Sequence, residues 1–189
     1  MRLVLVGPPG AGKGTQAAAL AAKLTVPHIS TGDLFRSNIA DQTDLGRLVK
    51  QYLDAGQLVP DSVTNDMVAA RFDDADVLAG FLLDGYPRNP SQVDVLDQML
   101  RDRGWALDAV VELVVDRDEI TQRLVQRAAS QGRSDDTAEV IRARFDVYDA
   151  ETAPVVARYR ETGLLREVDG LGTVNDVTSR LLAALGVTA

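Results

Sequence analysis

The chain has no cysteine among its 189 residues and one histidine, His28. It can therefore form no disulfide, no thiolate zinc site and no cysteine nucleophile, and one histidine cannot build a multi-histidine metal site. No apolar run reaches the roughly 18 to 20 residues that span a membrane. The start, MRLVLVGPPG, is typical of a strand and a turn rather than of a signal peptide. We expect a cytoplasmic protein with no zinc and no membrane partner.

Basic residues are scarce, and lysine is the scarcer kind. Lys and Arg total 20 against 28 acidic residues, for a net charge of −8, and only three of the 20 are lysine. This balance argues against DNA or RNA as the main partner, although a cleft can still be locally basic. With 46% hydrophobic and 25% charged residues, the composition is that of one soluble globular domain.

Short apolar runs alternate with segments of helical pattern along the chain, which predicts an α/β fold with a parallel sheet and right-handed crossovers. The crossover between the second and third strands is unusually long, so it is a candidate inserted sub-domain. The expected strands are residues 3–6, 28–30, 80–85, 109–115 and 164–168. The expected helices are 13–24, one that begins at Thr31, 45–55, 61–73, 91–103, 118–127, 137–161 (bent or split before Pro154) and 173–185, with a polar loop over 128–136.

A phosphate-binding loop is the most specific motif in the sequence. Residues 7–13, GPPGAGK, fit the pattern G-x-x-x-x-G-K between a strand and a helix. The glycines let backbone N–H groups converge on an anion, and Lys13 can reach the β- and γ-phosphates. Gly14 stands where most such loops carry a hydroxyl that binds Mg²⁺ directly, and the hydroxyl comes one place later at Thr15. Direct ligation of Mg²⁺ by the loop is therefore in doubt.

Four segments together resemble one family. They are GPPGAGKGTQ at residues 7–16, STGDLFR at 30–36, DGYPR at 84–88 with Gln92 four places on, and RSDD at 133–136 followed by Arg142 and Arg144. In this order they resemble the nucleoside monophosphate kinases, and in particular bacterial adenylate kinases with a short lid. The resemblance runs over nearly the whole chain.

The resemblance implies a three-layer phosphate-loop fold, in which helices flank a parallel sheet. One domain would comprise a core (1–29, 60–125 and 138–189), an AMP-binding helical sub-domain (30–59) and a lid (126–137) that is too short to be the zinc-binding form. The implied reaction is ATP + AMP ⇌ 2 ADP, which serves adenine nucleotide homeostasis. Mg²⁺ would accompany ATP, and ATP, AMP and ADP would be the partners of a monomer.

Residue roles are also implied by the resemblance. Asp84 would hold Mg²⁺ through water, and the bond between Tyr86 and Pro87 would be cis. The catalytic residues would be Lys13, Arg88, Arg127, Arg133 and Arg144. The ATP-binding residues would be Gly10, Ala11, Gly12, Lys13, Gly14, Thr15, Arg123, Arg127 and Gly172. The AMP-binding residues would be Thr31, Arg36, Gln57, Leu58, Val59, Gly85, Tyr86, Pro87, Arg88, Gln92, Arg133 and Arg144.

Competing interpretations remain open at this point. A pyrimidine or other nucleoside monophosphate kinase would share the fold; Gln92, whose amide suits adenine, and the hydroxyl of Thr31 favour AMP. The alternative is a solvent-facing Gln92 and a Thr31 that only caps a helix. A phosphate-loop switch or ATPase that acts as a binding module is a different class, but the chain lacks N-K-x-D and has no evident residue to place water. We interpret Arg101, Arg103, Arg158 and Arg160 as surface ion pairs, and His28 and Trp105 as structural.

Overall fold

A computed structural model describes residues 1–131 and 137–187. Within these residues, a five-stranded parallel sheet has the order β2-β3-β1-β4-β5. The register pairs Leu5 of β1 with Asp84 of β3 and with Val111 of β4, and pairs Ser30 of β2 with Asp84. The carboxyl ends of β2, β3 and β1 therefore meet at one edge of the sheet. The strands are β1 (Arg2–Val6), β2 (His28–Ser30), β3 (Phe81–Asp84), β4 (Ala109–Val114) and β5 (Leu165–Asp169).

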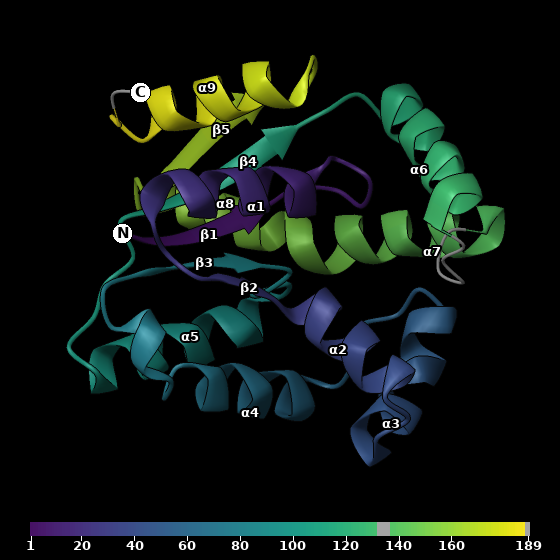
Figure 1. Cartoon of the computed structure of the whole chain (residues 1–189), viewed down its shortest axis with the longest axis horizontal. Helices are drawn as coiled ribbons and strands as arrows, with labels where there is room; N and C mark the ends of the chain where they lie inside the picture. Colours follow the sequence, from purple (N-terminus) through teal and green to yellow (C-terminus); the bar gives the residue numbers. More distant parts are fainter. Residues whose placement is uncertain (132–136, 188–189) are drawn as a thin grey trace.

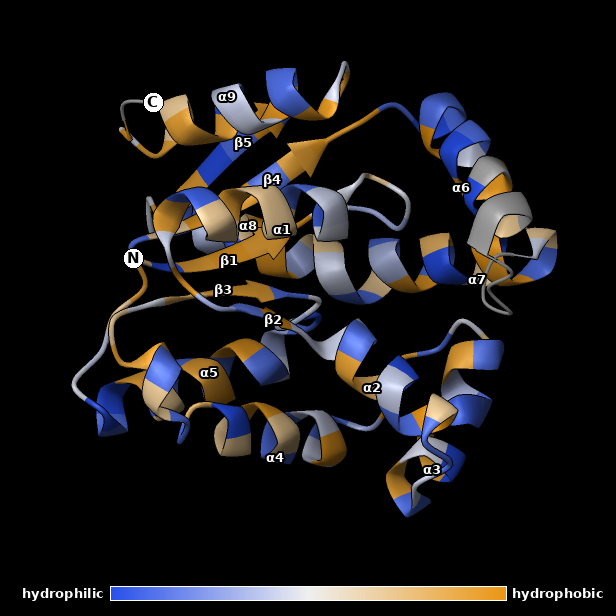
Figure 2. Cartoon of the chain, viewed as in Figure 1, coloured by the Kyte–Doolittle hydropathy of each residue, from blue (hydrophilic) through white to orange (hydrophobic). Residues whose placement is uncertain are grey.

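Helices cover both faces of the sheet, so the molecule has three layers (Figure 1). On one face α1 (Lys13–Leu24) and α9 (Val174–Ala184) bury Leu20 and Leu181 against the strands. On the other face α4 (Asp61–Arg71), α5 (Pro90–Asp102) and α8 (Ala153–Glu161) contribute to a second core, where Leu96 is fully buried. β1, β3 and β4 are apolar along most of their length (Figure 2), as strands covered on both faces must be.

Two helices of the long crossover, α2 (Thr31–Ala40) and α3 (Asp44–Asp54), stand beside the sheet rather than over it (Figure 1). A small core around Phe35, Val49 and Val59 lies between them, and Val63 and Met67 of α4 also pack against it. The two helices touch at Gly46, where an added Cβ would lie 2.0 Å from the carbonyl oxygen of Asn38. A glycine is therefore required for this close packing.

The start of α2 corrects one expectation. Ser30, not Thr31, is the N-cap: its hydroxyl accepts a hydrogen bond from the backbone N–H of Asp33 at 3.2 Å. Ser30 still has extended backbone angles, whereas Thr31 is the first helical residue. An N-cap oxygen accepts from the N–H two or three residues farther on, so spacing allows either residue, and the extended backbone of Ser30 decides.

The chain after β4 also departs from the expected pattern. α6 (Arg117–Gln131) continues through four residues that we expected to be in a loop, and the rest of that loop lies outside the described residues. The segment 137–161, by contrast, is split before Pro154 as expected: α7 (Ala138–Val147) leads through a π-helical turn (Tyr148–Thr152) into α8, which has Pro154 in its first turn. A short 3₁₀ turn (Ala75–Val77) was not expected. In the described part of the chain, no helix is both long enough and apolar enough to cross a bilayer.

Candidate active site

The phosphate loop connects β1 to α1 in the way that the motif predicts. Gly12 is the N-cap of α1 and has a left-handed backbone with φ of 91°, which glycine adopts without strain. The backbone N–H of Ala11 donates to the carbonyl of Pro8 at 3.2 Å, which closes a tight turn. The first turn of α1 contains no acidic side chain of its own, so the positive end of the helix dipole faces the loop. The loop and the helix N-terminus together form a site for an anion.

Lys13 lies inside this loop. Its ammonium group donates hydrogen bonds to the carbonyl oxygens of Gly7 and Pro8, at 2.7 and 2.9 Å. Burial lowers the pKa of Lys13 to about 7; the carboxylate of Asp84 opposes this shift, and nearby arginines, Arg88 first among them, add to it. The amine therefore lies where a bound phosphate would raise its pKa again and favour the protonated form.

Asp84 is the last residue of β3, at the carboxyl-terminal edge of the sheet, and is 7% exposed. Its Oδ2 lies 3.5 Å from Nε2 of His28, a buried nitrogen that has no hydrogen-bond partner among the described residues. A Cβ added at Gly14 would lie 3.7 Å from the same oxygen, so the carboxylate is close to the first turn of α1. A carboxylate beside the hydroxyl-bearing Thr15 in one cavity is an oxygen donor set that fits Mg²⁺ with part of its water shell.

Arginines surround the largest cavity of the site, which we call the loop cavity. Its volume is about 400 Å³, and the lining includes most of the phosphate loop together with Asp84. Arg36 comes from α2, Arg88 from the segment after β3, Arg127 from α6 and Arg144 from α7, and all four line the same space. This is a locally basic cleft on an acidic protein. Arg133, which we predicted to join them, lies outside the described residues.

A second cavity of about 70 Å³, the α2 cavity, lies between α2, the end of α3 and the segment after β3. Phe35, Leu53 and Thr64 also line it, and sequence reasoning did not find these three. The lining contains nine of the residues expected to bind AMP: Thr31, Arg36, Gln57, Leu58, Val59, Gly85, Arg88, Gln92 and Arg144. Gly85 has a φ of +83°, and an added Cβ would lie 2.7 Å from the hydroxyl of Thr31, so glycine is required where these segments meet.

Tyr86 and Pro87 do not line the α2 cavity. The peptide bond between them is cis, as the resemblance implied. Tyr86 is 1% exposed, and its hydroxyl donates to the side-chain oxygen of Asn65 at 2.7 Å. Pro87 instead lines a smaller cavity beside Lys13.

Gln92 and Thr31 are both buried, so Gln92 is not a solvent-facing residue. The amide oxygen of Gln92 accepts from the backbone N–H of Arg88, and its amide nitrogen donates to Asp61, each at 2.7 Å. The hydroxyl of Thr31 donates to the carbonyl of Gly85 at 3.0 Å. In this structure both side chains therefore hold the walls of the α2 cavity together.

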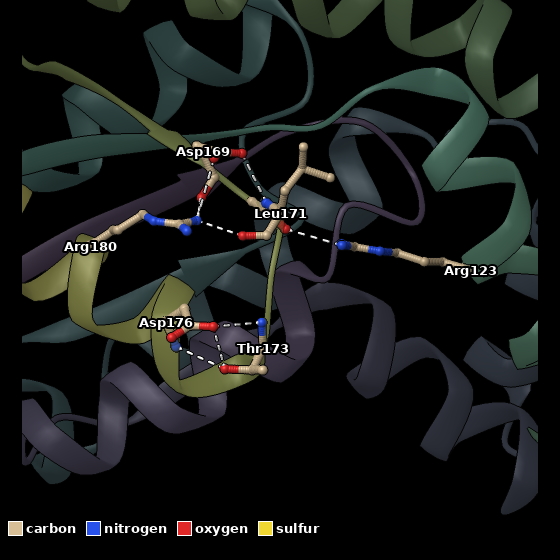
Figure 3. Close-up of polar contacts among 7 residues, drawn as sticks. Arg123, Asp169, Leu171, Thr173, Asp176 and Arg180 are labelled. Atoms are coloured by element: carbon tan, nitrogen blue, oxygen red, sulfur yellow. Dashed lines mark hydrogen bonds and ion pairs between the residues drawn. The ribbon is translucent and has the colours of Figure 1, made fainter.

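Arg123 links the phosphate loop to the segment that follows β5, and Figure 3 shows its contact with that segment. It pairs with Glu119 at 2.8 Å and donates to the carbonyl oxygens of Gly170 at 3.2 Å and Ala11 at 3.5 Å. Gly172 lies two residues farther on, beside the capping box that Thr173 and Asp176 form at the start of α9. Ala11, Arg123 and Gly172, which we predicted to bind ATP, do not line the loop cavity.

Comparison with known proteins decides the family. The adenylate kinase family model matches residues 5–164. An adenylate kinase from Kocuria rhizophila is 58% identical over 97% of this chain and 98% of its own length, and one from a Nocardioides species is 55% identical over 99% and 98%. One from Thermobifida fusca is 54% identical over 98% of both chains. The chain belongs to the adenylate kinase family.

As an adenylate kinase family member, the protein is a phosphotransferase, and the expected fold class and family are confirmed. No observation favours the pyrimidine-kinase or ATPase alternatives. Of the arginines that we interpreted as surface ion pairs, Arg103, Arg158 and Arg160 pair with acidic residues, while Arg101 binds the amide of Gln98 instead. Trp105 packs edge-on to Phe72 in the core, with ring centroids 5.9 Å apart.

Proposed function

We propose that the two cavities bind the two nucleotides of the reaction ATP + AMP ⇌ 2 ADP. The observation that carries this proposal is that the cavities share part of their walls. Arg36, Gly85, Arg88 and Arg144 line both the loop cavity and the α2 cavity. A triphosphate on the phosphate loop and a monophosphate in the α2 cavity would therefore meet at the same arginines, as direct phosphoryl transfer requires.

The proposed chemistry needs no covalent intermediate. Lys13 would neutralise the β- and γ-phosphates, Arg36 and Arg88 would hold the AMP phosphate, and Arg127, Arg133 and Arg144 would stabilise charge on the transferred group. Arg123 and Gly172 would border the ATP base, with residues 10–15 around its phosphates. The guanidinium fork suits phosphate oxygens, which explains why arginine rather than lysine dominates the site.

Asp84 is the residue that we propose for Mg²⁺, through the water shell of the ion. Gly14 offers no hydroxyl, and the carboxylate, whose Oδ2 would lie 3.7 Å from a Cβ at Gly14, is a hard oxygen donor close to that position. The cation would supply charge neutralisation on the phosphates of ATP.

Residues 30–59 would form the AMP-binding sub-domain and residues 126–137 the lid, and both would close over the substrates to exclude water. The hydrophobic cluster around Phe35, Val49 and Val59 supports the first assignment, because all three of its buried residues come from residues 30–59. We further propose a monomer in the cytoplasm that binds neither nucleic acid nor membrane.

The acceptor base would be adenine. Thr31 and Gln92 supply polar groups to the α2 cavity, and residues 57–59 supply backbone groups and an apolar wall. In this structure the amide of Gln92 is occupied by Arg88 and Asp61, so contact with a base would use its remaining hydrogen-bonding capacity.

The test compares MgATP turnover with and without AMP. We expect two ADP per ATP consumed, and no inorganic phosphate from MgATP alone. Release of phosphate at the same rate without AMP would instead assign the site to a hydrolase.

A further inference from the structure

A π-helical turn, Tyr148–Thr152, separates α7 from α8 on the sheet face below the active site. Its hydrogen bonds run from residue i to i+5, so it holds one residue more than an α-helical turn, and such turns are uncommon outside functional sites. None of the roles proposed above uses this turn.

Both ends of the turn are hydrogen-bonded to other elements: one end to the segment after β3 and the other to strand β4. The hydroxyl of Thr152, a residue only 7% exposed, donates to the carbonyl oxygen of Arg88 at 2.8 Å. The hydroxyl of Tyr148 hydrogen-bonds the carboxylate of Glu112 on β4. The turn therefore spans the sheet between β4 and the segment that follows β3.

The extra residue changes which way Thr152 faces. In a regular α-helix, eight positions at about 100° each would put Thr152 about 80° around the axis from Arg144. One additional residue in the turn takes up roughly one such step, which brings the two side chains to within about 20° of each other. In agreement, Arg144, Tyr148 and Thr152 all line one cavity of about 60 Å³ that also contains Lys13 and Arg88.

Arg88 is held by its backbone on two sides. Its N–H donates to the amide oxygen of Gln92 in α5 at 2.7 Å, and its carbonyl accepts from Thr152. Its own guanidinium donates through Nε to the carbonyl of Gly85 at 2.9 Å. The backbone that carries the guanidinium is thus held by contacts from two different helical elements.

We propose that Thr152 is a positioning residue for Arg88, and that the π-helical turn exists to bring its hydroxyl to the Arg88 carbonyl. Without that hydroxyl, the part-buried carbonyl lacks this donor and the segment shifts, which moves the guanidinium away from the acceptor phosphate. The inference rests on the proposed function, because it assigns the effect to the site of AMP.

The experiment replaces Thr152 by valine, which keeps the shape and removes the hydroxyl, and by serine, which restores it. We expect Thr152→Val to raise the KM for AMP about tenfold, which is the scale for a carbonyl away from water that loses its donor. The Kd for ATP should stay within about twofold of the wild type. Thr152→Ser should stay within about twofold of the wild type in both. Thr152→Ala, which also lacks the hydroxyl, replaces the valine variant if the latter does not bind ATP or shows no melting transition.

Thr178→Val is the matched control. Thr178 is also 7% exposed, and its hydroxyl likewise donates to a backbone carbonyl at 2.8 Å. It lies on α9, however, where it faces Gln16 of α1. We expect this variant to lower Tm without changing KM for AMP. If Thr152→Val behaves like Thr178→Val, with a lower Tm and an unchanged KM for AMP, the positioning role is wrong.

A second readout uses Arg88→Ala as background. There, Thr152→Val should add less than about twofold to the KM for AMP, because the group that it positions is gone. A full tenfold effect in this background would overturn the proposal. Wild-type protein that does not consume AMP would refute the proposed function instead, so the two failures are distinguishable.

Discussion

Lys13 should take up a proton when a nucleoside triphosphate binds to the phosphate loop. In the nucleotide-free protein the amine is buried and hydrogen-bonded only to neutral carbonyl groups among the contacts described, and burial lowers its pKa to about 7. A triphosphate brings several negative charges to the same place and favours the ammonium form. The pKa should then rise well above the pH of the experiment.

The size of the effect follows from the free-state pKa. With a pKa of about 7, about three quarters of the amines are neutral at pH 7.5, about a tenth at pH 6 and nearly all at pH 8.5. Binding of MgATP should therefore take up about 0.1, 0.75 and 1 proton at these three values. The uptake rises with pH because a depressed lysine pKa leaves more neutral amine to be protonated.

Isothermal titration of MgATP in two buffers of different ionisation enthalpy measures this uptake as the change in apparent binding enthalpy. Lys13→Arg is the matched control, because a guanidinium stays protonated at every pH used. Its binding should show none of the Lys13 uptake. Equal proton uptake by the wild type and by Lys13→Arg at pH 7.5 would refute the reasoning.

Three further predictions concern the charges of the site. Lys13→Met should lower kcat by about 10² to 10³, the scale for losing one preorganised electrostatic donor, with the fold intact by circular dichroism; near-wild-type kcat would exclude Lys13 from the mechanism. Arg36→Ala and Arg88→Ala should raise the Kd for AMP far more than that for ATP in separate titrations, and equal weakening would show that the division of the two sites is wrong. Arg144→Ala should lower kcat more than it weakens the binding of either nucleotide, because its contacts to both substrates complete only on closure. Steady-state kinetics and binding titrations together measure this, and a larger effect on binding than on kcat would contradict it.

The fold could be predicted from the sequence where local signals suffice. The run of apolar residues 3–6, followed by glycines and Lys13, determines strand, loop and helix within a dozen residues. The same local logic failed at residues 128–131: their small and polar side chains suggested a loop, yet alanine and glutamine are good helix formers and α6 continues through them.

The π-helical turn could not be predicted, because it depends on contacts far away in the sequence. Pro154 indicated that the helix bends or splits before it, but the π-helical form of the break goes with a contact between Thr152 and Arg88 across 64 positions. The cap of α2 shows the same limit at short range: Ser30 and Thr31 are both good caps, and only the backbone angles decide between them.

The candidate site came partly from residue chemistry and partly from the family resemblance. Glycines and a lysine in one loop predict a phosphate site physically. The grouping of Thr31 with residues 57–59 and Gln92 follows no local rule, and it came from the resemblance alone. The structure brings these residues into one cavity, but the amide of Gln92 is bound to Arg88 and Asp61, and no local pattern predicts these two contacts.

The most direct test of the proposed reaction is the initial rate with MgATP and equal concentrations of AMP or UMP. A buried pocket that matches the hydrogen-bonding edge of adenine should reject a base whose polar groups stay unpaired, at a cost of about 1–3 kcal/mol per group. We predict that AMP is phosphorylated at least about tenfold faster than UMP. Equal rates with the two nucleotides would contradict the adenine assignment and favour a kinase of broader or pyrimidine specificity.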